Sequence, residues 1–297
     1  MEEPRVFNLD HPPIESLVQQ HLAAWQARDV AAIAGTLHPE VEFIWPALHG
    51  QSRREARAVL ETRLAEVQSL YLHLRRLLID PAQRVAAVEW IGRYARSGEK
   101  DCQEILGGAV LDFDQEGLIY RWRTYLDPVR RRTLSGFDDP LPSEGWLPCP
   151  NPGPPPSPAQ VQQIIQTYAQ AWARHDLTQL NAAIHDEMIV QPPWDYVVGR
   201  AAIEAGARVY FANYTDTCVT PQRLILDPSQ PHFGVCEQTF ACTNPDTGRR
   251  GEDHDFAFFE IAQGKLRYWR TYFDTSRSAQ VVEKTVGFLQ SNRSHPK

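Results

Sequence analysis

The chain has 297 residues, 42% of them hydrophobic, which is enough for the core of one large domain or of two ordinary ones. A formal net charge of −7 and a pI of about 5.8 argue against a nucleic-acid-binding protein, because such proteins usually carry a basic patch. No apolar run approaches the roughly 18 residues that a membrane span needs, and no apolar signal-peptide core follows Met1. We therefore expect a cytoplasmic protein that binds neither nucleic acid nor membranes.

The first part of the chain predicts three helices. Apolar residues recur at helical spacing over 14–25, and Asp29 then suits the N-cap of a short second helix. A short extended segment, 41–45, precedes a third helix over about 52–66 that begins just after Gly50.

Strand patterns separated by turn signals follow these helices. The predicted strands are Tyr71–Leu78, Arg84–Ala95, Cys102–Phe113 and Leu118–Leu126. Helices followed by a meander of strands indicate the α+β class, in which a curved antiparallel sheet wraps around the helices. Such a sheet leaves a cone with one open end, where ligand sites often lie.

A proline-rich segment then interrupts the pattern. Pro140 to Pro158 contains nine of the 23 prolines of the chain, so it favours extended polyproline geometry over helix. We interpret it as a semi-rigid linker, with a partner-binding motif as the alternative. The predicted division is a first domain over 1–139, a linker over 140–158 and a second domain over 159–297.

The second domain repeats the first. The segment Trp122-Arg-Thr-Tyr125 recurs as Trp269-Arg-Thr-Tyr272, 147 positions on, and the same offset relates Asp29 to Asp176. After small insertions, Glu89 aligns with Glu237. The predicted helices are 161–172 and 200–211 with a short one after Asp176, and the predicted extended segments are 188–191, 218–226, 233–243, 254–261 and 265–273.

These features resemble the nuclear transport factor 2-like superfamily, which includes SnoaL-like and ketosteroid isomerase-like domains. The resemblance rests on the order of elements, on the Trp25–Asp29 segment repeated as Trp172–Asp176, and on the closing Trp-Arg-Thr-Tyr strand. It implies a cystatin-like cone in each copy. It does not fix an activity, because the superfamily holds isomerases, cyclases, dehydratases, epoxide hydrolases and non-catalytic binding proteins.

The catalytic positions of the best-known enzyme branches are not retained. Tyr168 matches the hydroxyl donor of ketosteroid isomerases, but the position of their catalytic base holds Trp45 in one copy and Pro192 in the other. The catalytic Asp on the closing strand of limonene-type epoxide hydrolases is replaced by Thr124 and Thr271.

Strand alternation favours a pocket in the second domain. Its predicted inward-facing residues are Tyr168, Trp194, Gln238, Phe240, Asp255, Trp269 and Thr271. Asp253 and Asp255 near an apolar wall would form an acid/base pair, with Tyr168 as a proton donor. In the alternative, both carboxylates sit in a loop after Gly251 and face water.

The first domain would present a more crowded interior. Its predicted inward-facing residues are His21, Trp45, Trp90, Trp122 and Thr124. We expect the three tryptophans to fill the small cone, which would make this copy a scaffold. His21 among aromatic side chains is more typical of a hydrogen-bonded core histidine than of a catalyst.

No motif indicates a metal or another cofactor. The densest histidine and carboxylate group is His232, Asp253, His254 and Asp255, and it lacks chelating spacing. The five cysteines also lack such spacing, so we expect reduced thiols.

The sequence therefore predicts a tandem protein that binds an apolar or aromatic small molecule, preferentially in the second domain. The alternative is an isomerase, cyclase, dehydratase or epoxide-hydrolase-like enzyme of secondary metabolism that uses an Asp of the second domain. We expect the two sheets to pack against each other within one chain, with a homodimer as the alternative. The candidate interface residues are Glu89, Arg123, Tyr125, Glu237, Arg270 and Tyr272.

Overall fold

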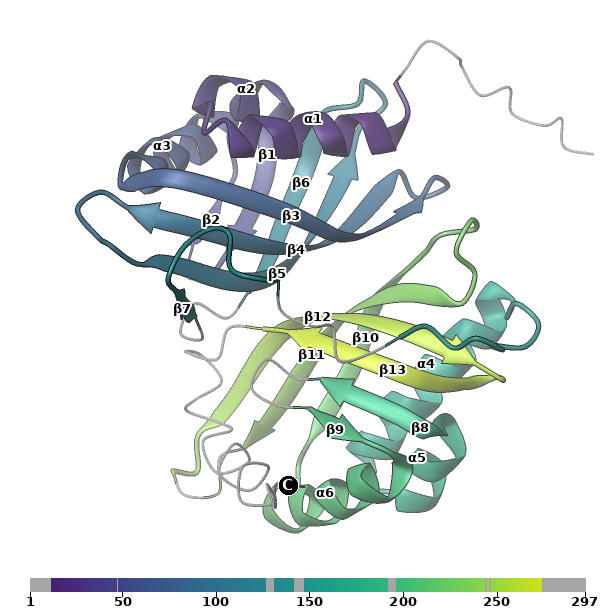
Figure 1. Ribbon diagram of the computed structural model, residues 1–297. Coiled ribbons are helices and arrows are strands. Elements are labelled where there is room, and N and C mark those ends of the chain that lie inside the picture. The colour runs from purple at the N-terminus through teal and green to yellow at the C-terminus, as the bar shows by residue number, and fades with distance from the viewer. Residues whose placement is uncertain are drawn as a thin grey trace, which may run out of the picture.

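The computed structural model describes residues 12–46, 48–126, 131–141, 147–191, 196–243, 245 and 247–273. The chain forms two successive sets of helices and strands, here called domain 1 (α1 to β7) and domain 2 (α4 to β13) (Figure 1). In both sets the helices cover one face of a curved, open sheet, which confirms the predicted α+β class. No helix of the described ranges is long and apolar enough to cross a membrane.

Domain 1 has one long sheet in the strand order β2-β1-β6-β5-β4-β3, with β7 paired to β5. The β1–β6 pair is parallel, and the other pairs are antiparallel. Its elements are α1 (Ile14–Gln26), α2 (Val30–Gly35), β1 (Leu37–Trp45), β2 (Leu48–Gly50), α3 (Arg53–Ala65), β3 (Val67–Asp80), β4 (Val85–Arg96), β5 (Cys102–Phe113), β6 (Ile119–Leu126) and β7 (Arg132–Leu134).

Domain 2 repeats this topology in the order β10-β11-β12-β13-β8-β9, again with one parallel pair, β13–β8. Its elements are α4 (Pro158–Ala173), α5 (Leu177–Ala183), β8 (Ile184–Gln191), β9 (Val197–Val198), α6 (Arg200–Asn213), β10 (Cys218–Leu226), β11 (Phe233–Thr243), β12 (Arg250–Ala262) and β13 (Lys265–Tyr272). The short strands β2, β7 and β9 were not predicted from the sequence.

Local capping fixes the helix starts in both copies. The Asp29 carboxylate accepts a 2.9 Å hydrogen bond from the backbone N–H of Ala32, and Asp176 accepts an equivalent 2.9 Å bond from Gln179. These bonds satisfy backbone donors that have no partner within the helix. The two predicted N-caps are therefore confirmed.

The sheets alternate between two apolar environments. On β12, Ala257 and Phe259 belong to the core enclosed by the domain 2 helices, whereas Phe256 and Phe258 belong to a separate apolar cluster on the outer face. Side chains on successive residues of a strand point to opposite faces, so this strand is apolar on both sides. An outer face of this kind needs a cover.

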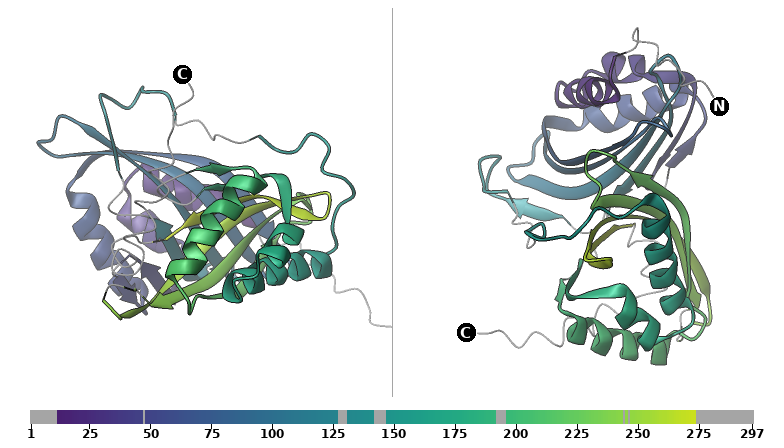
Figure 2. Two further views of the ribbon diagram at one scale, coloured as in Figure 1. Left: turned by 90° about the horizontal axis from the view of Figure 1, so that it is seen from below. Right: turned by 90° about the vertical axis from the view of Figure 1, so that its right-hand side faces the viewer.

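The outer faces of the two sheets cover each other. Figures 1 and 2 show the sheets in the middle of the molecule and the helices of each domain at opposite ends. The shared cluster contains Leu78, Val85, Ala87 and Val110 from domain 1, and Ile189, Ile225, Val235, Phe256, Phe258, Tyr268 and Tyr272 from domain 2. This is the predicted pairing of sheets within one chain.

Charged side chains cross the interface in a matched pattern. The Tyr272 hydroxyl donates to Glu89 of domain 1, and Arg270 pairs with the same carboxylate at 3.2 Å. In the reverse direction, the Tyr125 hydroxyl donates to Glu237 at 2.6 Å, and the guanidinium of Arg123 lies 2.9 Å from that carboxylate.

All six predicted interface residues therefore take part in these contacts, and equivalent residues play equivalent roles in the two copies. Glutamine side chains extend the symmetry. Gln83 donates to the carbonyl oxygen of Leu224, and Gln230 donates to that of Leu77, both at 2.9 Å. The interface thus has an approximate two-fold axis.

The linker is anchored to both domains. The buried guanidinium of Arg93 donates to the carbonyl oxygens of Phe137 and Asp139, both at 2.6 Å, and of Pro140 at 3.1 Å. Near the other end, the backbone N–H of Gln263 donates to the Pro152 carbonyl at 2.6 Å. The chain is thus held to domain 1 shortly after β7 and to domain 2 shortly before α4.

We predict that Glu89→Ala lowers the free energy of unfolding by about 3–5 kcal/mol, because it leaves Arg76 and Arg270 without their shared buried counter-charge. The matched control is Glu42→Ala, which removes an ion pair with Arg121 between side chains that are 33% and 41% exposed. That change is expected to cost less than about 1 kcal/mol. Urea unfolding measures both values. Equal losses in the two variants would show that the buried interface ion pairs stabilise the fold no more than an exposed pair.

Candidate functional site

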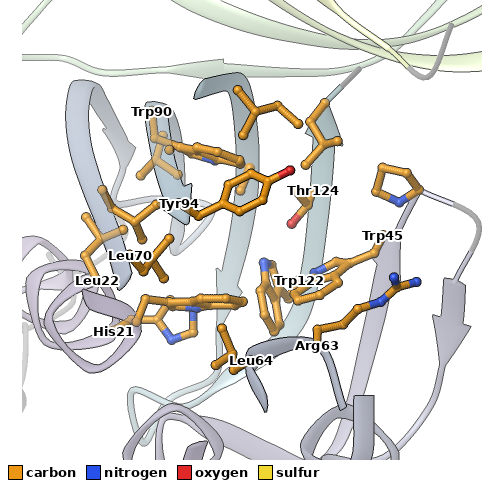
Figure 3. Close-up of a pocket in the computed structure, with 18 of the residues that line it drawn as sticks. His21, Leu22, Trp45, Arg63, Leu64, Leu70, Trp90, Tyr94, Trp122 and Thr124 are labelled. Atoms are coloured by element: carbon orange, nitrogen blue, oxygen red, sulfur yellow. The ribbon is translucent and has the colours of Figure 1, made fainter. Parts of the chain in front are cut away.

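Domain 1 encloses a cavity of about 330 Å³ between α1, the end of α3 and the concave face of its sheet (Figure 3). The lining is mostly aliphatic and aromatic. Four of its residues are tryptophans: Trp25, Trp45, Trp90 and Trp122.

Three of the tryptophans form one wall by packing against each other. The ring centroids of Trp45 and Trp122 lie 5.0 Å apart with the rings almost perpendicular, and Trp25 lies 5.6 Å from Trp45 and 5.7 Å from Trp122. Edge-to-face contacts of this kind are favourable and hold the rings in fixed positions. The wall is therefore preorganised.

Trp90 forms part of the lining on the sheet. Its indole lies over Gly107, where an added Cβ would come within 2.6 Å of a Trp90 ring atom. The neighbouring Gly92 is similarly tight, since a Cβ there would lie 3.0 Å from the same ring. Two glycines on adjacent strands thus let the indole lie flat on the sheet, so that the space above it stays open.

This cavity differs from what the sequence led us to expect for domain 1, whose tryptophans were expected to fill the cone. The indoles instead pack against each other and against the sheet, so they surround the space rather than occupy it. The expectation of a better-formed pocket in domain 2 stays a prediction.

In domain 2, larger side chains occupy the corresponding positions. In the alignment that pairs Glu89 with Glu237, Phe240 takes the place of Gly92. In the alignment that pairs Asp29 with Asp176, Phe211 takes the place of Leu64. Phe211 packs against Trp172 at 5.4 Å, and Tyr210 lies 6.3 Å from Phe240. These side chains belong to one apolar cluster between α4, α6 and β11.

His21 lines the cavity as a neutral, fully bonded side chain. Its Nδ1 lies 2.7 Å from the Thr36 hydroxyl, which itself donates to the carbonyl of Ile33, so Nδ1 must carry the proton and donate. Its Nε2 accepts from the Trp25 indole at 3.1 Å. Burial lowers the pKa of His21 from 6.5 to about 4. Nδ1 therefore holds the ring against Thr36 and Nε2 positions Trp25, so neither nitrogen is available as a base.

The lining carries further polar groups besides His21. Thr124 and Trp45 were predicted to face inward, whereas Tyr94 and Arg63 were not identified from the sequence. Alternation from Trp90 through Gly92 would have placed Tyr94 on the same face, and Arg63 follows Leu60 by three residues on α3. The Trp45 Nε1 atom is buried and has no hydrogen-bond partner among the described residues.

The predicted residues of domain 2 lie on the concave face of its sheet or on the helix above it. Gln238 is paired with Asp255 across neighbouring strands, and its side-chain amide donates to that carboxyl at 3.3 Å. Trp269 packs on Tyr168 at 5.0 Å, and Thr271 follows two residues later on the same face. Trp194 lies outside the described residues.

The two carboxylates of domain 2 have different environments. β12 begins at Arg250, four residues earlier than predicted, because β11 and β12 pair without interruption from Thr243 onward. Asp255 is only 5% exposed, so the interpretation of a solvent-facing loop is wrong for this residue. Burial and the nearby charge of Asp253 raise the pKa of Asp255 well above its ordinary value. Asp253 is partly exposed.

Tyr168 is also buried, which raises the pKa of its hydroxyl. The structure thus brings Asp255 together with Gln238 and brings Tyr168 together with Trp269. Among the residues that the structure describes, no group of three or more histidine, cysteine or carboxylate side chains is placed to hold a metal ion.

Similar folds occur in known structures. A protein with a ketosteroid isomerase-like fold from Catenulispora acidiphila, solved with trimethylamine, is 12% identical, covers 39% of this chain and 88% of its own, and has a TM-score of 0.36. An LEH-like epoxide hydrolase of Mycobacterium tuberculosis is 16% identical (47% and 96% covered, TM-score 0.37). TsrD from Streptomyces laurentii is 21% identical (44% and 98% covered, TM-score 0.37). At such low identity the likeness concerns the fold alone.

A comparison with curated proteins finds no match. The model of the SnoaL-like domain family, however, matches the sequence twice, over residues 18–122 and 165–269. These two matches fall on the two sets of elements described above and together cover more than half of the chain. The chain therefore belongs to the SnoaL-like domain family, as a tandem member with two copies of the domain.

Proposed function

We propose that this protein binds an apolar, aromatic small molecule in the cavity of domain 1. The observation that carries the proposal is the cavity itself, about 330 Å³ in volume and bounded by four indoles. This volume lies at the lower end of the roughly 300–1,000 Å³ that is typical of small-molecule sites. Flat aromatic ligands suit such walls, because stacked and edge-to-face contacts with indoles are favourable.

The energetics agree with a ligand of two or three rings. An aromatic group of side-chain size removes about 150–250 Å² of surface from water, which contributes on the order of 5 kcal/mol before the costs of association. Preorganisation of the indole wall reduces those costs, since the rings already hold each other in place.

The polar chemistry of the cavity favours binding over catalysis. His21 uses both ring nitrogens within the protein, and no carboxylate is among the described lining residues. A general base within reach of a substrate proton is the minimum for acid–base chemistry.

We predict that Leu64→Phe weakens binding, because it brings an aromatic ring into the domain 1 cavity, as Phe211 brings one against Trp172 in domain 2. Titration calorimetry with the neutral probe 2-naphthamide should show at least about tenfold weaker binding, while the stability changes by less than about 1.5 kcal/mol. Ala65→Phe is the matched control, since it adds the same ring on the exposed side of the same helix turn. Unchanged affinity in Leu64→Phe would place the binding site elsewhere.

A second candidate function is an enzyme that uses Asp255 of domain 2 as an acid/base and Tyr168 as a donor, for an isomerase-, cyclase-, dehydratase- or hydrolase-type reaction. The observation in its favour is the burial of Asp255 with a raised pKa on the concave face of the sheet. Carboxyl groups perturbed in this way are common at active sites.

The ionisation of Asp255 has a testable effect on stability. A carboxyl whose pKa is raised on folding is not destabilising below its unfolded pKa of about 3.9, and it costs stability progressively as the pH rises toward its folded pKa. We therefore predict that Asp255→Asn is more stable than the wild type at pH 7 and that this advantage disappears near pH 3. Glu252→Gln, at an exposed site on the same strand, is expected to show no such dependence.

Thermal or urea unfolding across this pH range measures the difference. An Asp255→Asn variant that is less stable than the wild type at neutral pH would mean that the charged carboxylate is favoured in the fold. The second candidate would then lose its argument that Asp255 is an acid/base with a raised pKa.

A further inference from the structure

The polar atoms around the domain 1 cavity are unbalanced between donors and acceptors. Arg63 and the indoles of Trp45, Trp90 and Trp122 can only donate hydrogen bonds. Tyr94 and Thr124 carry hydroxyls that can both donate and accept. The His21 nitrogens are already used, and no carboxylate or side-chain amide lies among the described lining residues. A ligand that pairs with all of these groups must bring acceptor atoms.

Two of the donors lie on one side of the cavity. Figure 3 shows Arg63 and Trp45 together at the edge near α3, whereas Tyr94 and Thr124 lie toward Trp90. Arg63 is an exposed side chain at the rim of the cavity. The buried Nε1 of Trp45 has no hydrogen-bond partner among the described residues. A buried donor without a partner carries a desolvation cost that a ligand acceptor would remove.

We propose that the ligand of this cavity is a flat aromatic acid. Its rings would lie between the indole walls, and the oxygen atoms of its carboxylate or acidic hydroxyl would face Arg63 and the Trp45 Nε1. This inference rests on the proposed function, since it names the chemical class that the domain 1 cavity selects.

The charge of the ligand follows from a competition between two effects. Indole faces attract cations as well as aromatic rings, so four tryptophans alone would also suit an organic cation. Arg63 at the rim repels a cation, and the described lining offers no carboxylate to offset that repulsion. A guanidinium binds a carboxylate through parallel charge-assisted hydrogen bonds, which favours the anion.

Arg63 also lies in the last turn of α3, where a positive charge interacts favourably with the helix dipole. That role affects only the stability of the protein and does not depend on the charge of a ligand. Measurements of affinity for ligands of different charge therefore separate the two roles.

The test uses three probes of nearly the same shape: 2-naphthoate, 2-naphthamide and 2-naphthamidinium, which are anionic, neutral and cationic at neutral pH. Titration calorimetry on the full chain is expected to rank them in that order, with naphthoate at least about tenfold tighter than naphthamidinium. Arg63→Gln should lower naphthoate affinity by about three- to fivefold, because the pair is exposed, and leave naphthamide unchanged. Arg54→Gln, which removes the same charge from an exposed site on α3, should leave all three affinities unchanged.

A second variant tests the buried donor. Trp45→Phe keeps an aromatic ring but removes the Nε1 proton, so it should weaken naphthoate more than naphthamide. Circular dichroism and thermal unfolding show whether each variant is folded, and the affinity for naphthamide shows whether its cavity remains open.

The outcomes separate this inference from the proposed function. If naphthamide binds and Leu64→Phe weakens its binding, but naphthamidinium binds as well as naphthoate, the cavity is a binding site without selectivity for acids and the inference is wrong. The inference is equally wrong if Arg63→Gln leaves naphthoate affinity unchanged. If none of the three probes binds, both the proposed function and the inference are overturned.

Discussion

The architecture depends on the exchange of buried charges between the outer faces of the two sheets. Each copy supplies a glutamate that is received by an arginine and a tyrosine of the other copy, as Glu89 is by Arg270 and Tyr272. A carboxylate that is 1% exposed is tolerated only where such partners surround it. The apolar cluster around these pairs supplies burial, and the pairs fix the register in which the faces meet. Both concave faces are thereby left for the helices and for whatever the cones enclose.

The two interiors differ although their frames are the same. In domain 1, glycines at 92 and 107 allow Trp90 to lie against the sheet, and the space beyond it remains open. In domain 2, Phe240 and Asp255 stand at the equivalent places, and aromatic residues from the end of α6 meet Trp172. The result is an aromatic cavity in domain 1 and a buried carboxyl beside Gln238 in domain 2.

Much of the frame was predictable from the sequence because it depends on local rules. The repeat, the N-caps at Asp29 and Asp176 and the inward faces of the strands follow from spacing, from capping chemistry and from alternation. The residues of the exchanged ion pairs were also predictable, because Glu89 and Arg123 in the first copy are repeated as Glu237 and Arg270 in the second. The parallel pairing of β1 with β6 is non-local, and the short strands β2, β7 and β9 carry too few residues for a pattern.

The tryptophans of domain 1 were predicted to fill their cone, but they line a cavity, and the reason is physical. Whether tryptophans fill a cone or line it depends on how they pack against each other, and their number alone does not decide this. The open space depends on small residues such as Gly92 and Gly107, which give no sequence signal for a cavity. It also depends on Leu64, where domain 2 has a phenylalanine. The alternative that Asp255 is exposed came from Gly251, which suggested a loop. Continuous pairing with β11 instead extends β12 from Arg250 through Asp255.

The fusion of both copies into one chain has a consequence for how such a protein can evolve. In a symmetric homodimer every substitution appears twice, so a change that closes one cone also closes the other. Here the anchored linker and the exchanged glutamates preserve the paired sheets, while each cone is encoded separately. Mutation can therefore explore one interior while the other keeps its role, and only the residues of the shared face must change in concert. In a duplicated gene of this kind, the two interface surfaces evolve together, whereas the two pockets evolve independently.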